Sequence, residues 1–264
     1  MSTRSARVPL LILLTGLLPG LVLADIQTEE VHYEHDGDSL TGYFAYPDSD
    51  GPHPGVLVVH EWWGHNDYAR DRAEQLAREG YAAFALDMYG SGKVADHPST
   101  AGDFAGEIRA NRARMLDRFG VAHDWLRGHE ATVEAAPSAV GYCFGGSVAL
   151  EAARAGMDLN VVASFHGSLA TEHPAEASNV TAEVLSFTGT ADPMIPAQQI
   201  AGFQQEMDAA DVRYTVVEFS GVKHSFTNPA ADAIAEEFSM PVGYDERADR
   251  DSWNHLMGVL RDRH

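Results

Sequence analysis

The sequence predicts an α/β protein in which helices cover both faces of a mostly parallel sheet. Short runs of β-branched and apolar residues recur along the chain, and helical stretches of roughly ten to twenty residues separate most of them. Several of these runs are apolar throughout, which is typical of strands buried on both faces. Alternating segments on either side of Asp36-Gly37-Asp38 predict one β-hairpin at the start, so we expect a mixed sheet.

Strands and helices are expected to alternate after this hairpin, which spans 29–47. The predicted strands are 54–61, 81–87, 137–143, 161–167, 182–192 and 213–219. The predicted helices are 66–80, 103–127, 145–156, 197–210 and 251–261. Open sheets of this kind bind ligands outside the carboxyl ends of their strands. Residues that directly follow a strand are therefore the first candidates for chemistry.

The N-terminal segment has the layout of a secretory signal peptide. Arg4 and Arg7 form a basic start, an apolar run covers 8–24, and Ala24 ends a cleavage site with small residues at −3 and −1. The alternative is a membrane anchor, but glycine and proline interrupt the run, which is short beside the roughly 20 apolar residues of a span. We therefore expect an exported protein, periplasmic or extracellular, with one domain over 25–264.

The charge balance is strongly acidic. The chain has 39 aspartates and glutamates against 18 lysines and arginines, a net charge of −21. Such a surface repels nucleic acid and anionic lipid, so we expect neither partner and no membrane contact after the leader is removed. We also expect a monomer. Cys143 is the one cysteine, so no internal disulfide can form, and its thiol either pairs with another molecule or is kept for chemistry.

The surroundings of Cys143 have the spacing of a nucleophile elbow. In Gly141-Tyr142-Cys143-Phe144-Gly145, a predicted strand precedes the cysteine and a predicted helix follows it. Glycines allow the strand and the helix to approach closely around a residue with strained backbone. The alternative is a small buried core cysteine. The helix N-terminus favours a thiolate at this position.

An elbow requires an acid and then a histidine later in the chain. Asp192 follows one predicted strand and His224 follows the next, so both order and placement fit. Alternatively, Asp192 caps the turn before Pro193, and His224 is simply one of 13 histidines. The agreement of three placements favours a Cys-His-Asp triad.

Two backbone N–H groups are expected to form an oxyanion hole, that of Phe144 after the nucleophile and that of Trp62 after an early strand. His60-Glu61 also resembles the start of a zinc-protease H-E-x-x-H motif. However, position 64 is glycine, His65 comes one residue late, and the segment leaves a strand. We therefore expect no metal and no organic cofactor.

Together these residues resemble the dienelactone hydrolase family of α/β-hydrolases, which carry cysteine in place of the usual serine. The resemblance lies in the blocks HEWWG, ALDMYG, GYCFGG, TGTADPMIP, HSFTNP and YDERADRDSWNHL, and it covers most of the mature chain. It implies the α/β-hydrolase fold, with Cys143 as nucleophile, His224 as base and Asp192 orienting the imidazole. It also implies that Glu61 interacts with the resting thiol, which would raise the pKa of that thiol.

The same resemblance assigns Tyr89, Ser91 and Asn228 to the substrate-binding site. Family members that act on dienelactone carry arginines for its carboxylate at the positions of Ser91 and Asn228. Here both are neutral, and Lys93 is the nearest cation in sequence. Neutral dipoles bind a carboxylate less well than the guanidinium fork does. The sequence therefore predicts a neutral small-molecule substrate.

The predicted function is hydrolysis of an ester or lactone through a thioester acyl-enzyme. One alternative is a carboxymethylenebutenolidase that acts on dienelactone itself, and another is a catalytically silent, ligand-binding member of the fold. A thiol redox protein would need a second cysteine, which the chain does not have. A peptidase on this fold is a weaker alternative, because the sequence has no added lid or propeller domain.

Overall fold

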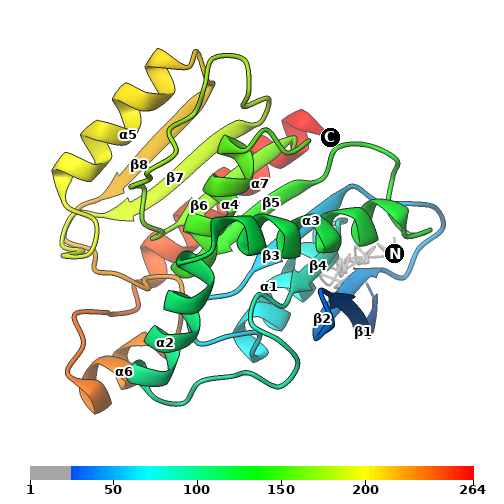
Figure 1. Ribbon diagram of the computed structural model, residues 1–264, viewed down its shortest axis with the longest axis horizontal. Coiled ribbons are helices and arrows are strands. Elements are labelled where there is room, and N and C mark those ends of the chain that lie inside the picture. Colours follow the sequence, from blue (N-terminus) through cyan, green and yellow to red (C-terminus); the bar gives the residue numbers. More distant parts are fainter. Residues whose placement is uncertain (1–24) are drawn as a thin grey trace, which may run out of the picture.

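The computed structural model describes residues 25–264 (Figure 1), so the predicted signal peptide lies outside the described residues. Eight strands form one sheet in the order β1-β2-β4-β3-β5-β6-β7-β8. Their bounds are β1 Ile26–His35, β2 Asp38–Pro47, β3 Gly55–Val59, β4 Ala82–Leu86, β5 Ser138–Tyr142, β6 Val161–Phe165, β7 Glu183–Gly189 and β8 Tyr214–Phe219. The pairing from β4 through β3 to β8 is parallel, while β1 and β2 form the antiparallel hairpin.

The described residues form seven helices, five between strands and two after β8. They are α1 Asp67–Arg78, α2 Pro98–Arg109, α3 Arg112–Gly128, α4 Phe144–Arg154, α5 Ala197–Ala209, α6 Ala231–Phe238 and α7 Glu246–Arg263. A mixed, mostly parallel sheet between helices confirms the predicted fold class. The short helix α6 was not among the predicted helices. No helix of residues 25–264 is both long enough and apolar enough to cross a membrane.

Buried strands send alternate side chains into two separate cores. In β3, Leu57 and Val59 pack with apolar residues of α2 to α5, whereas Val56 and Val58 pack with α1 and α7 on the opposite face. This period of two, on a strand without exposed residues, explains why the sequence is apolar throughout. All six parallel strands end at one edge, where their following loops meet.

The predicted single helix 103–127 is wrong, because two helices occupy this stretch. The first ends at Arg109, and the second begins after Asn111, whose side-chain oxygen accepts a hydrogen bond from Arg114 N–H at 3.0 Å. Asparagine is a strong N-cap residue because it satisfies an N–H group that the helix leaves free. The break leaves Arg109 at the end of a helix, beside the site described below.

Candidate active site

Cys143 lies between β5 and α4 with φ 52° and ψ −114°, a strained backbone for a residue other than glycine. Two flanking glycines make this turn sterically possible. A Cβ on Gly141 would lie 2.0 Å from the carbonyl oxygen of Gly145, and one on Gly145 would lie 2.2 Å from that of Val59. The structure therefore has the geometry of a nucleophile elbow at the position that the sequence predicts.

Asp192 and His224 come from the loops after β7 and β8 and are hydrogen-bonded to each other. Nδ1 of His224 donates to Oδ2 of Asp192 at 2.7 Å, and both side chains are buried. The other carboxylate oxygen accepts Met194 N–H at 2.8 Å. These two bonds hold the carboxylate in a single orientation, which in turn selects the imidazole tautomer.

The charge around His224 favours its protonated form. Burial lowers the pKa of His224, but the charge of Cys143 and the hydrogen bond to Asp192 outweigh burial and raise the pKa to about 10. Nε2, the ring nitrogen that does not face Asp192, is buried and has no hydrogen-bond partner among residues 25–264. It is free to exchange a proton with the thiol or with a substrate.

Cys143 and His224 line one cavity of about 180 Å³. Its walls are mostly apolar, and Arg109 is the one arginine or lysine among the described residues that line it. The full lining is Trp62, Trp63, Arg109, Cys143, Met194, His224, Ser225, Ile234, Met240 and Val242. We call this space the catalytic cavity. It suits a small substrate with an apolar body.

The two predicted oxyanion donors have free N–H groups. Neither Trp62 N–H nor Phe144 N–H donates to a protein acceptor in the described part of the chain. Trp62 lines the catalytic cavity, and its carbonyl accepts the Tyr89 hydroxyl at 3.1 Å. Free backbone donors beside the nucleophile are what a developing oxyanion requires.

Glu61 does not bind the thiol directly. It is 1 % exposed, Asn228 donates its amide to one carboxylate oxygen at 2.6 Å, and Ser225 donates its hydroxyl to the other at 3.2 Å. Within the described residues no hydrogen bond joins Glu61 to Cys143. The predicted interaction with the resting thiol is therefore replaced by contacts to the loop that carries His224. Burial raises the pKa of Glu61, and the Asn228 hydrogen bond opposes that rise.

The three residues predicted to contact substrate do not line the catalytic cavity. Ser91 is exposed, and its hydroxyl bonds those of Thr41 at 2.7 Å and Ser39 at 3.1 Å. Asn228 is buried against Glu61, and Tyr89 is buried with its hydroxyl on the Trp62 loop. Contact of these three residues with substrate therefore stays a prediction. Asn228 and Tyr89 position residues of the site, and Ser91 packs on the hairpin.

His166 is a residue that the sequence reasoning missed. The Cys143 N–H donates to the Phe165 carbonyl at 2.9 Å and also to Nδ1 of His166 at 3.2 Å. With Nδ1 as an acceptor, Nε2 of His166 carries the proton and donates to Thr227 Oγ1 at 2.8 Å. Burial lowers the pKa of His166 well below its ordinary value, with smaller contributions from His224 and Arg72. A neutral histidine thus supports the strained elbow from the strand next to it.

The pH dependence of stability should reveal the buried charge of Glu61. Because the folded-state pKa of Glu61 is raised above 4.5, ionising this group destabilises the fold as pH rises from about 4.5 through the folded pKa. Glu61→Gln keeps the shape without the charge: its one oxygen can accept the Asn228 amide, and its amide nitrogen can donate to the Ser225 hydroxyl, which then acts as acceptor. We expect the difference in melting temperature, Glu61→Gln minus wild type, to be more positive at pH 8 than at pH 4. A difference that is independent of pH would contradict this account.

No group of three or more histidine, cysteine, aspartate or glutamate side chains within residues 25–264 is arranged to hold a metal ion.

Comparison with known proteins identifies the family. The sequence model of the dienelactone hydrolase family matches residues 40–263. The chain belongs to the dienelactone hydrolase family. This membership agrees with the resemblance described above, and it makes the protein a hydrolase of lactones or esters.

Two relatives and one solved structure align with this dienelactone hydrolase family member over most of both chains. It is 28% identical to "Protein usf" of Aquifex pyrophilus over 88% of this chain and 97% of that one. It is 26% identical to the "Probable 2-oxo-3-(5-oxofuran-2-ylidene)propanoate lactonase" of Bradyrhizobium sp over 86% and 90%. A crystal structure of a dienelactone hydrolase-like promiscuous phosphotriesterase from metagenomic libraries superimposes with a TM-score of 0.84 at 30% identity, covering 90% of this chain and 98% of that one.

Proposed function

We propose that this family member hydrolyses a small ester or lactone through a thioester on Cys143. The observation that carries the proposal is the shared cavity in which the strained Cys143 faces the His224–Asp192 pair. Burial lowers the pKa of His224, but the charge of Cys143 and the hydrogen bond to Asp192 outweigh burial and raise the pKa to about 10, so His224 can hold the proton that the thiol gives up.

In the first half-reaction the Cys143 thiolate attacks the carbonyl carbon and a C–S bond forms. The developing oxyanion accepts hydrogen bonds from the free N–H groups of Trp62 and Phe144. The C–O bond then breaks, and the leaving oxygen takes the proton of His224 Nε2. In a lactone this oxygen remains attached to the acyl group.

In the second half-reaction His224 removes a proton from water, and the resulting hydroxide attacks the thioester carbon. The C–S bond breaks, the carboxylic acid leaves, and the thiolate is restored beside the imidazolium. Asp192 keeps Nδ1 protonated throughout, so Nε2 is always the nitrogen that exchanges protons.

Acyl-enzyme trapping tests this mechanism directly. Rapid acid quench of the protein with 4-nitrophenyl acetate should show one acetyl group by intact mass, located on Cys143 by peptide mapping. Cys143→Ala should show none. Turnover without an adduct in the wild type, or an adduct on another residue, would contradict the thioester. Absence of both turnover and adduct, across esters and lactones, would instead favour the catalytically silent alternative.

The charge of the substrate depends on residues that line the cavity. The prediction of a neutral substrate rested on Ser91 and Asn228, and neither lines the catalytic cavity. Arg109 does line it. The physical basis of that prediction is therefore removed, and a substrate with an acidic group, such as dienelactone itself, becomes the alternative that the structure favours.

Export and a monomeric state complete the proposal. The basic start and apolar run of the leader support export, and we expect the mature N-terminus within a few residues of Asp25. N-terminal sequencing of the extracytoplasmic protein would contradict this if it began at Met1 or Ser2. Among described residues the only exposed large apolar side chains are Val94 and Met194, and the lack of a larger apolar patch supports a monomer. Light scattering should therefore give the mass of one chain.

A further inference from the structure

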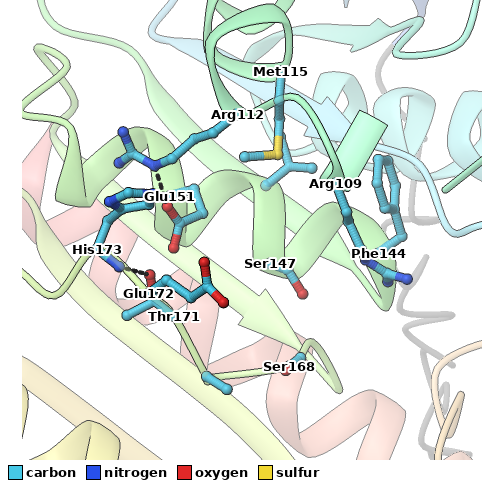
Figure 2. Close-up of a pocket in the computed structure, with 12 residues that line it drawn as sticks. Arg109, Arg112, Met115, Phe144, Ser147, Glu151, Ser168, Thr171, Glu172 and His173 are labelled. Atoms are coloured by element: carbon cyan, nitrogen blue, oxygen red, sulfur yellow. Dashed lines mark hydrogen bonds and ion pairs between the residues drawn. The ribbon is translucent and has the colours of Figure 1, made fainter. Parts of the chain in front are cut away.

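Arg109 lies between the catalytic cavity and a second cavity of about 230 Å³. The second cavity runs along α4, the helix that follows the nucleophile, and Ser147 and Glu151 of that helix line it. Figure 2 shows Arg109 and Phe144 together on one side of this space, with Arg112 on the opposite side. Because Arg109 lines both cavities, a substrate at Cys143 lies beside a residue that also borders the second cavity.

The charge of Arg109 is not neutralised by the described protein. No carboxylate or other acceptor of residues 25–264 binds its guanidinium group, which lies 5.4 Å from the ring centroid of Phe144. By contrast, Arg112 on the other side of the second cavity bonds Glu151 at 2.7 Å. The positive charge therefore remains available to a ligand on the Arg109 side only.

The second cavity also presents a free hydroxyl group. Ser147 Oγ is buried and has no hydrogen-bond partner in the described structure. Of the two carboxylates that line the cavity, Glu151 is paired with Arg112, and Glu172 is exposed (Figure 2). The charge of Glu172 disfavours an anion near it, so an anion would bind on the side of Arg109 and Phe144.

We propose that Arg109 binds an anionic group of the substrate, with the scissile carbonyl at Cys143 and the anion in the second cavity. The substrate class is an ester or lactone whose apolar body carries a terminal carboxylate, such as a dicarboxylic acid monoester. The inference rests on the proposed function. It assigns substrate recognition to the C-terminal end of α2, an element that carries neither Ser91 nor Asn228.

A matched pair of esters tests Arg109. Mono-4-nitrophenyl adipate and 4-nitrophenyl hexanoate have acyl chains of equal length and differ in the terminal carboxylate. We expect Arg109→Gln to lower the adipate-to-hexanoate ratio of kcat/KM by about tenfold or more, the usual effect of a charged hydrogen bond. Arg109→Lys should recover part of the ratio, mainly through KM, and added salt should weaken the wild-type preference because Arg109 is exposed.

Arg247→Gln is the control, since it removes the same charge from an exposed position on α7 and should leave the ratio within twofold. An unchanged ratio in Arg109→Gln, or a wild-type preference for hexanoate, would overturn the proposal. If neither ester is hydrolysed the proposed function fails, and calorimetric binding of adipic acid monoamide then decides about Arg109. Weaker binding to Arg109→Gln than to wild type would support the site, and equal or absent binding would overturn it.

Discussion

Cys143→Ala is expected to lower kcat for ester hydrolysis by at least ~10³-fold, because the members of a catalytic triad act as a unit. His224→Ala should have a similar effect, since Nε2 of His224 is the proton carrier at the thiol. Asp192→Asn should cost no more than either, because it disturbs the tautomer and orientation of the imidazole and leaves the nucleophile in place.

Steady-state rates on 4-nitrophenyl esters measure these losses. His32→Ala provides a control, because His32 is an exposed histidine on β1, far from the catalytic cavity along the sheet. Its kcat should stay within twofold of wild type. Near-full activity in Cys143→Ala, with an unchanged melting temperature, would eliminate the thioester mechanism and leave the fold assignment intact.

Gly141→Ala is expected to destabilise the protein by at least ~3 kcal/mol, at the high end for a single added methyl group. The new Cβ would lie 2.0 Å from the carbonyl oxygen of Gly145 and 2.6 Å from Gly146 N. Both obstacles are backbone atoms at the start of α4, so no side-chain rotation can relieve the overlap. The elbow would have to open, and Cys143 would lose its position over the catalytic cavity.

Chemical denaturation of purified protein measures the loss, and Gly202→Ala supplies the matched control. A Cβ on Gly202, within α5, would meet no atom within 4 Å. Alanine favours a helix over glycine by about 0.5–1 kcal/mol, so this variant should be neutral or slightly more stable. Equal midpoints for Gly141→Ala and wild type would show that the elbow tolerates a side chain and is not sterically tight.

Most of the elbow and its partners could be predicted because their constraints are local or topological. Gly141 and Gly145 act on the residues beside them, so their spacing around Cys143 is visible in the sequence. Asp192 and His224 follow two strands of a parallel sheet, and such strands end at one edge whatever their side chains. The hydrogen bond between them therefore follows from the order of the elements.

The substrate-facing residues could not be predicted in this way. A loop residue's neighbours depend on how the loop folds back, and Ser91 turns toward the hairpin hydroxyls of Ser39 and Thr41. Asn228 is close to the site, as expected, but its amide is taken by Glu61. His166 was missed because its role depends on the path of a strand adjacent in space, and its position in the sequence carries no spacing signal.

The sequence by itself determined the α/β fold, the strained cysteine turn and the order of the acid and the histidine, because apolar periodicity, glycine spacing and parallel topology act along the chain. Only the tertiary structure decided which charge lines the catalytic cavity. The helix break before Asn111 leaves Arg109 at the end of α2, between two cavities. The sequence pattern predicts one continuous helix over this stretch. Side chains distant in sequence define a cavity through packing, which no local pattern encodes.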